Sequence, residues 1–434
     1  MLAGFPMRYP KYIENNFIFP DFYRVKINHP PRGLEQPEKT LHQRLQKIFP
    51  QSGIKPDDTV AIGVGSRGIA NIPLLVTTLC RSLREIGAKP FIIPAMGSHG
   101  AATAKGQIKV LEKLGITETV CGAPIISSMA VGTVGQAMGE VPVYFSRDAL
   151  EMDHSICINR IKPHTKFKGP VESGLYKMLC IGMGKHQGAL SYHNMALKHG
   201  FSPLLKAMGD KIIQKTNFRF GIAIVEDFFD HTMAIESIMA EDIFARESRL
   251  LIQAREHFPH LPFKELDVLV IEQIGKEISG SGMDPNVTGR TFDLMEDDFS
   301  ESLKAGRIAI LNLSDNTAGN GIGLGNADII TEKVFQGLDY ESTLMNAMTS
   351  MSLRKAFIPI RLPSDEKAIQ AAFTTRGPLE PTTVRAVIIK DTLHVQEFWA
   401  SQALLPELTA MKNTDILEKV SLNFNESGEL LGVR

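Results

Sequence analysis

The chain reads TVAIGVG at residues 59–65, and an amphipathic helical segment at 72–86 and a second apolar run, PFIIPA, at 90–95 follow it. A loop, MGSHGAAT, then leads into another helical segment at 104–114. Apolar runs of strand length that alternate with helices are typical of a parallel sheet joined by right-handed crossovers. This region is therefore predicted to be a β–α–β–α unit of an α/β domain.

The same pattern extends outward on both sides of the segment HFPHLP at 257–262. Further strands are predicted at 155–158, 220–225, 267–272, 307–313 and 384–390. We therefore predict an α/β fold of two domains, 1–265 and 266–434, each built on a mainly parallel sheet. Ligands bind at the carboxyl ends of strands in open α/β sheets and often between domains. We accordingly expect an active-site cleft between the domains, lined by loops that follow strands.

Composition excludes several classes of protein. The 434 residues are 43% hydrophobic and carry a net charge of −1, which argues against a disordered chain and against a basic surface for nucleic acid. No apolar run approaches the ~20 residues of a membrane span, and the N-terminus does not resemble a signal peptide. The four cysteines form no C-x-x-C pair, so neither disulfides nor a cysteine zinc site are expected. These features predict a soluble, cytoplasmic protein.

A histidine stands in the loop after the second predicted strand, in the sequence Gly97-Ser98-His99-Gly100. The flanking glycines leave the imidazole uncrowded and allow a ligand to approach the backbone. A histidine in such a loop can act as a general acid or base near neutral pH. The alternative is that His99 is a surface residue or caps the next helix.

The segment 159–193 reads NRIKPHTKFKGPVESGLYKMLCIGMGKHQGALSYH, a polar loop that returns into an apolar run. Such a segment is longer than a simple connection between two elements needs to be, and it is typical of a loop that binds a ligand. Lys177 lies between Tyr176 and Met178, and partial burial there would depress its pKa and make it a candidate covalent anchor. The alternative is a lysine at a helix start whose ammonium group extends to solvent.

Four histidines lie close together in this part of the sequence: His164, His186, His193 and His199. His186 and His193 are about two helical turns apart, so they can share one face of a helix. Imidazole is a ligand for nickel, zinc, copper and iron. A metal site is therefore one interpretation of this cluster, and an ordinary set of polar side chains is the other.

The ordered set Gly97-Ser98-His99, Pro163-His164-Thr165, Ser173–Lys177 and His193 resembles the nickel-dependent lactate racemase family of 2-hydroxy acid racemases and epimerases. His99 and His164 are 65 residues apart, and Lys177 and His193 are 16 apart, as in the family pattern. At the level of motifs the resemblance covers about residues 60–200. Beyond them it depends on chain length and the two-domain layout.

The resemblance implies a cofactor, a nickel-pincer pyridinium mononucleotide with two sulfur-bearing arms. Lys177 would hold it covalently, and His193 would be the protein ligand of the nickel ion. Backbone N–H groups at Ser173 and Gly174, near an expected helix start, would cradle its phosphate. In the two-domain division, the N-terminal domain would carry the cofactor and the C-terminal domain would close the cleft.

The resemblance also implies a reaction, racemisation or epimerisation by proton-coupled hydride transfer to the cofactor. His99 and His164 would be the two catalytic acid/base groups, one on each face of the substrate. Arg67, after the first strand, matches the family arginine expected to bind the substrate carboxylate, for which its planar fork is suited. The alternative for Arg67 is a surface ion pair.

Three departures from the family pattern concern the substrate. The family has an acidic-His-Thr-Arg-Pro run around its arginine, and here the run is VGSRG at 64–68. The turn before the lysine is ESGLY at 172–176, without the family's neighbouring arginine. In the second domain, 282–286 lacks the expected Gln and Lys, for which Lys276 is a candidate replacement. We therefore expect a 2-hydroxy acid other than lactate, either a larger one or a sugar acid.

Two alternatives to a nickel-pincer isomerase stay open. One is another metal- or nucleotide-dependent α/β enzyme, although the glycine-rich segment at 316–326 lacks the third glycine of G-x-G-x-x-G. The other is a non-catalytic binding protein of the same fold. The expected partners are a small 2-hydroxy acid and the enzymes that make the cofactor, with no nucleic acid and no membrane.

Overall fold

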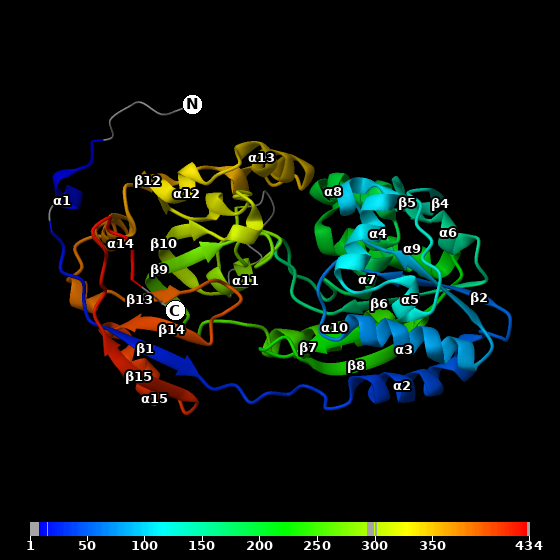
Figure 1. The fold of residues 1–434 in the computed structure, drawn as a ribbon. Coiled ribbons are helices and arrows are strands. Elements are labelled where there is room, and N and C mark those ends of the chain that lie inside the picture. The colour runs from blue at the N-terminus through cyan, green and yellow to red at the C-terminus, as the bar shows by residue number, and fades with distance from the viewer. Residues whose placement is uncertain (1–7, 15, 293–298, 300–301, 432–434) are drawn as a thin grey trace. The chain divides into compact units, whose positions relative to one another are not determined.

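The structure is a computed structural model that describes residues 8–14, 16–292, 299 and 302–431. The chain divides into two compact units, one formed by Pro30–Phe258 and the other by the chain up to His29 together with Pro259 onward (Figure 1). Each unit contains a mixed, mainly parallel sheet covered by helices, so the α/β prediction is confirmed.

The unit 30–258 is built on a five-stranded sheet of order β3-β2-β6-β7-β8. The first four strands are parallel, and β8 pairs antiparallel with β7. Their bounds are β2 (Thr59–Val64), β3 (Lys89–Pro94), β6 (His154–Arg160), β7 (Phe218–Glu226) and β8 (Thr232–Met239). The strands predicted at 59–65, 90–95, 155–158 and 220–225 thus form, within two residues at each end.

Helices and a separate hairpin surround this sheet. The hairpin pairs β4 (Val131–Ala137) with β5 (Val141–Ser146). The helices are α2 (Pro37–Ser52), α3 (Ile72–Glu85), α4 (Ala104–Lys113), α5 (Glu118–Cys121), α6 (Arg147–Leu150), α7 (Leu175–Lys177), α8 (Lys185–His199), α9 (Phe201–Lys215) and α10 (Ile243–Glu256). A core cluster of aliphatic side chains, among them Leu41, Ile62, Leu79 and Ile156, joins α2 and α3 to the sheet.

The parallel strands of this sheet bring three loops to one edge. The chain leaves β2, β3 and β6 at their carboxyl ends, and in a parallel sheet these ends lie on the same side. The loops after these strands carry Arg67, His99 and His164. The topology therefore places these side chains at the edge where ligands bind in open α/β sheets.

The other unit contains an eight-stranded sheet of order β12-β11-β10-β9-β13-β14-β1-β15. The strands are β1 (Phe22–Ile27), β9 (Glu265–Ile274), β10 (Lys304–Leu313), β11 (Ile329–Thr331), β12 (Ile360–Leu362), β13 (Ala386–Ile389), β14 (Glu397–Ser401) and β15 (Thr414–Val420). The helices of this unit are α1 (Lys11–Glu14), α11 (Pro285–Thr288), α12 (Glu332–Gln336), α13 (Tyr340–Thr349), α14 (Asp365–Thr374) and α15 (Leu405–Ala410). Its five strands from β12 to β13 are parallel.

The first strand of the chain belongs to this second sheet. β1 lies antiparallel between β14 and β15, with Phe22 opposite both Ser401 and Val420. The division at residue 265 placed this segment in the N-terminal domain. Phe22 and Val25 are fully buried in this sheet, and local periodicity does not encode a pairing between segments so far apart in the chain.

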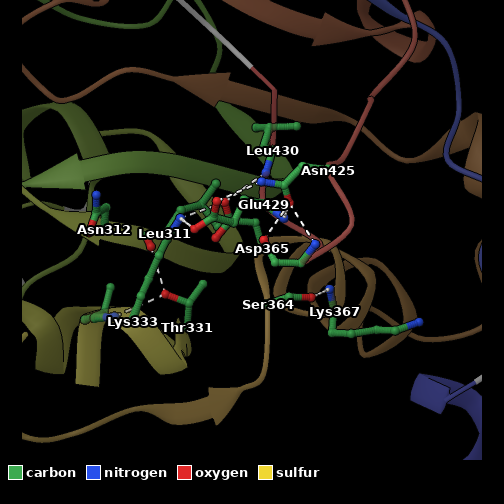
Figure 2. A network of polar contacts seen from close by, with 12 residues as sticks. Leu311, Asn312, Thr331, Lys333, Ser364, Asp365, Lys367, Asn425, Glu429 and Leu430 are labelled. Carbon is green, nitrogen blue, oxygen red and sulfur yellow. Dashed lines mark hydrogen bonds and ion pairs between the residues drawn. The ribbon is translucent and has the colours of Figure 1, made fainter. Parts of the chain in front are cut away.

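A buried carboxylate ties three segments of this unit together (Figure 2). Asp365, the first residue of α14, accepts hydrogen bonds at Oδ2 from Lys333 Nζ at 2.9 Å and from the Leu430 N–H at 3.0 Å. Ser364 caps the same helix by accepting the N–H of Lys367. Burial raises the pKa of Asp365, and the Lys333 ammonium opposes that rise. The network thus links α12, α14 and the C-terminal segment.

None of the helices in the described residues combines the length and the apolar character needed to cross a bilayer.

Candidate active site

Two of the three loops at the carboxyl edge are joined directly. Ser66, in the loop after β2, lies with its Oγ 2.5 Å from Nδ1 of His99, in the loop after β3. Ser66 is the neighbour of Arg67, so this contact brings the candidate substrate-binding loop to the candidate acid/base group. The His99 side chain is exposed, as proton exchange with a substrate requires.

The third loop, after β6, is organised by a buried carboxylate. Glu172 is fully buried and accepts the backbone N–H groups of His164 at 2.6 Å and Gly169 at 3.0 Å. Arg255 from α10 pairs with the same carboxylate, which balances its charge. Because both ends of the turn are tied to one side chain, the loop presents His164 in a defined position.

His164 has a defined orientation and tautomer. Its ring stacks on Phe167 with the centroids 4.4 Å apart, and its Nδ1 accepts the Lys166 N–H at 3.0 Å. A nitrogen that accepts a hydrogen bond carries no proton, so neutral His164 holds its proton on Nε2.

Lys177 ends α7, where the chain continues into the π-helical turn Met178–Gly182. Its side chain is half-buried and has no hydrogen bond or ion pair within the described residues. Burial lowers the pKa of Lys177 to about 7, helped by the positive charges of Arg67 and Lys162. The lowered pKa favours the neutral amine, which is the nucleophilic form of lysine.

His193 lies on α8 and has a buried Nδ1 with no hydrogen-bond partner among the described residues. Burial, followed by the charges of Lys166 and Lys177, lowers the pKa of His193 to about 4. The imidazole is thus neutral at pH 7 and keeps a lone pair, which is the state that binds a metal ion.

The histidines of the cluster do not come together as a protein-only metal site. His199 pairs with Glu140 at 2.8 Å, whereas Nδ1 of His186 is buried without a partner. Across the part of the chain that the structure describes, no three His, Cys, Asp or Glu side chains are placed to hold a metal ion.

Arg67 makes no ion pair with any described residue, although solvent reaches its side chain. The surrounding protein and the nearby Arg160 guanidinium lower the pKa of Arg67. Arg160 itself pairs with Glu226. Among the described residues, Arg67 therefore does not form the surface ion pair considered as the alternative. Its guanidinium group can bind an anion from solution.

Several backbone N–H groups at the helix start before Lys177 have partners within the protein. The Ser173 N–H donates to the carbonyl of Lys162 at 3.2 Å, and the N–H groups of Leu175 and Tyr176 donate to the Glu247 carboxylate at 2.9 and 3.0 Å. Of the two backbone N–H groups expected to hold a phosphate, that of Ser173 thus binds a group of the protein. The Ser173 hydroxyl and the Gly174 N–H have no partner within the described residues.

Glu247 was not anticipated from the sequence, because it lies in α10 far along the chain. It is fully buried, and burial raises its pKa to about 8 while the two N–H donors oppose that rise. Ser66 was also missed, because its sequence neighbourhood gives no signal of a contact with a histidine 33 residues later.

Lys276, the candidate replacement in the second unit, follows β9 and is exposed. Its backbone N–H donates to Thr317 Oγ1 at 3.2 Å.

Two comparisons with known proteins found a similar domain or structure. Residues 39–202 match the model of the lactate racemase N-terminal domain. That range holds Arg67, His99, His164, Lys177 and His193. Among solved structures, the lactate racemase apoprotein from Thermoanaerobacterium thermosaccharolyticum is similar, with 15% identity, a TM-score of 0.47, and coverage of 78% of this chain and 83% of that chain. Curated protein sequences show no significant match. Over residues 39–202, this chain is therefore similar to a lactate racemase N-terminal domain.

Proposed function

We propose that this protein is a racemase or epimerase of a 2-hydroxy acid other than lactate, with a nickel-pincer pyridinium mononucleotide attached to Lys177. The observation that carries the proposal is the state of Lys177. Its side chain is half-buried and unpaired within the described residues, and its pKa is near 7. A half-buried lysine without such a partner costs stability, which favours a chemical role over a packing role.

The residues present fit such a cofactor. His193 offers a neutral imidazole whose buried Nδ1 has no protein partner, as a metal ligand requires. Arg67 and Lys162 act electrostatically on Lys177, and Lys166 acts on His193, so the surroundings favour anions. Ser173 Oγ and Gly174 N–H are the donors that we assign to the phosphate. When bound, the nickel-pincer nucleotide supplies an acceptor for the hydrogen on C2 of the substrate.

The chain's own groups then bind the substrate and move its hydroxyl proton. Arg67 binds the carboxylate through two parallel hydrogen bonds. His99, oriented by Ser66, takes the hydroxyl proton from one face. His164 carries a proton on Nε2 and returns one from the other face. Two proton-transfer groups are needed because the configuration at C2 inverts.

The departures in sequence bear on the substrate. Gly65, Ser66 and Gly68 surround Arg67 with small side chains, where the family pattern has a histidine, a threonine and a proline. Smaller neighbours leave more room beside the carboxylate of the substrate. We therefore assign a larger 2-hydroxy acid or a sugar acid to this site.

The test is the mass of the full-length protein and of its Lys177 peptide after co-expression with the enzymes that make the cofactor. We expect added mass on that peptide together with bound nickel. Lys177→Ala should lose both, and Lys198→Ala, a matched control on the exposed side of α8, should keep both. Unmodified Lys177, beside a family member that loads under the same conditions, would refute the cofactor assignment.

A loaded protein is then screened with 2-hydroxy acids in deuterated water. We expect inversion without solvent deuterium at C2, because the hydrogen removed from C2 returns to it. Rapid deuterium incorporation would instead indicate direct proton abstraction at carbon. Inactivity of the loaded protein toward every 2-hydroxy acid would favour a binding protein of this fold.

A further inference from the structure

The loop that carries His99 has a strained backbone. Gly97 and Gly100 have φ of 60° and 66°, and the two alanines that follow, Ala101 and Ala102, have φ of 55° and 53°. Residues with a Cβ seldom adopt this left-handed conformation, because the Cβ crowds the following carbonyl oxygen. Such a conformation persists only where the surrounding structure holds it.

Gln107 holds both ends of the turn at His99. This side chain, in the first turn of α4, is fully buried. Its Nε2 donates to the carbonyl of Gly97 at 2.9 Å and to the carbonyl of His99 at 3.4 Å. One buried amide therefore determines where the backbone of His99 lies.

Lys185 orients that amide. It is fully buried at the start of α8, and its Nζ donates to the carbonyl of Pro94 at 2.6 Å and lies 3.5 Å from Gln107 Oε1. Because the ammonium group faces Oε1, the NH₂ group of Gln107 must face the loop carbonyls. Lys185 thus connects the last residue of β3 with the side chain that holds His99.

Lys185 also occupies an unfavourable position. Its φ is 54°, where glycine is preferred, and it places an ammonium group in a buried site. A glycine would relieve the backbone strain, and an apolar side chain would avoid burying the charge. Neither substitute would hold Gln107, so packing alone does not explain this lysine.

We propose that Gln107 and Lys185 are positioning residues, which hold the His99 loop against the helix that bears His193. Lys185 and His193 lie two turns apart on α8, so the pair of hydrogen bonds connects the element carrying the proposed nickel ligand to the proposed proton-transfer group. The effect of these two residues on catalysis by His99 rests on the proposed function. The structural claim concerns the loop itself and is tested without cofactor.

The first test is hydrogen exchange of the full-length, cofactor-free protein, read at residues 97–103. The amides of His99, Ala102 and Thr103 bond within this loop. In Gln107→Glu and Lys185→Met we expect their exchange to accelerate by about tenfold or more. Ser155→Ala is the matched control, since it removes a buried hydrogen bond to Asn217 elsewhere in the same sheet. Gln107→Met provides a second variant if Lys185→Met does not fold.

The second test follows the His99 ring in the same proteins by NMR. If the loop is held as proposed, the ring signals and their titration shift in Gln107→Glu and not in Ser155→Ala. Loop exchange and His99 signals that stay as in wild type would overturn the proposal.

In the loaded enzyme, we expect Gln107→Glu to lower kcat by about tenfold or more with little change in KM, because the carboxylate-binding Arg67 is untouched. If the loaded protein is an active racemase and Gln107→Glu does not change its kcat, the catalytic part of this inference is wrong and the proposed function still holds. A loop loosened as expected in a protein without racemase activity would support the structural claim and refute the proposed function.

Discussion

Replacing Lys177 with methionine should stabilise the protein at neutral pH. Burial and the charges of Arg67 and Lys162 lower the pKa of Lys177 from 10.5 to about 7. A tenfold change in a proton equilibrium corresponds to about 1.4 kcal/mol, so keeping this charge folded costs at most roughly 5 kcal/mol. Solvent reaches part of the side chain, and we therefore expect Lys177→Met to gain about 2–4 kcal/mol at pH 7.

The pH dependence of this gain follows from the direction of the pKa shift. The unfolded chain binds the proton up to about pH 10.5, whereas the folded protein releases it near pH 7. The cost is thus fully present below pH 7, decreases as the pH rises from 7 to 10.5, and disappears above that range. The advantage of Lys177→Met should follow the same course and fall below about 1.5 kcal/mol at pH 9.5.

The assay must report on the unit 30–258. The single tryptophan, Trp399, lies in the other unit, so its fluorescence does not report on this one. Hydrogen exchange of β2 and β6 peptides across a urea series measures the relevant unfolding step. Lys109→Met, an exposed change on α4, is the control and should have little effect. A Lys177→Met protein that is no more stable than wild type at pH 7, or whose advantage is the same at pH 7 and 9.5, would refute the reasoning.

Three further predictions concern the surroundings of this lysine. Since burial lowers the pKa of His193 to about 4, the NMR signals of its ring in the cofactor-free protein should not change between pH 8 and 5.5. A titration midpoint of His193 inside that range would contradict this prediction. Because burial raises the pKa of Glu247 to about 8, the wild-type protein should lose stability as the pH rises from about 4.5 to 8. Glu247→Gln should remove that loss when the free energy of unfolding is measured in urea. A pH profile of stability that is the same in both proteins would contradict this prediction. Gly209→Ala should destabilise the unit by about 1–3 kcal/mol, although alanine usually favours a helix, because the new Cβ would lie 2.3 Å from the Tyr176 ring. A gain in melting temperature for Gly209→Ala would show that the ring can move.

The parallel core and the positions of the main site residues could be predicted from local pattern. Runs such as TVAIGVG are too short and too apolar for a surface helix, and their alternation with amphipathic segments leaves few other topologies. The spacing of His99, His164, Lys177 and His193 pointed to one family, and the domain match over 39–202 agrees with it. Arg67 and His99 come together because both follow parallel strands.

Other features depend on contacts between distant segments, which periodicity does not encode. The antiparallel strands β1, β14 and β15 meet across almost the whole length of the chain. The helix start near Ser173 has the local appearance of an anion site. Glu247, more than 70 residues later, accepts the N–H groups of Leu175 and Tyr176 at this helix start.

By itself, the sequence determined the fold class and the chemical types available at the carboxyl edge of the first sheet, because strand and helix periods are local properties. Only the tertiary structure decided the state of those groups. Lys177 is an ordinary lysine in the sequence, and it becomes a partly neutral amine because α7 buries it near Arg67 and Lys162. His193 keeps a lone pair because its surroundings exclude water and add positive charge. Desolvation and nearby charges shift the pKa of a group through contributions from many parts of the fold. The reactivity of this site therefore arises only after the chain has folded.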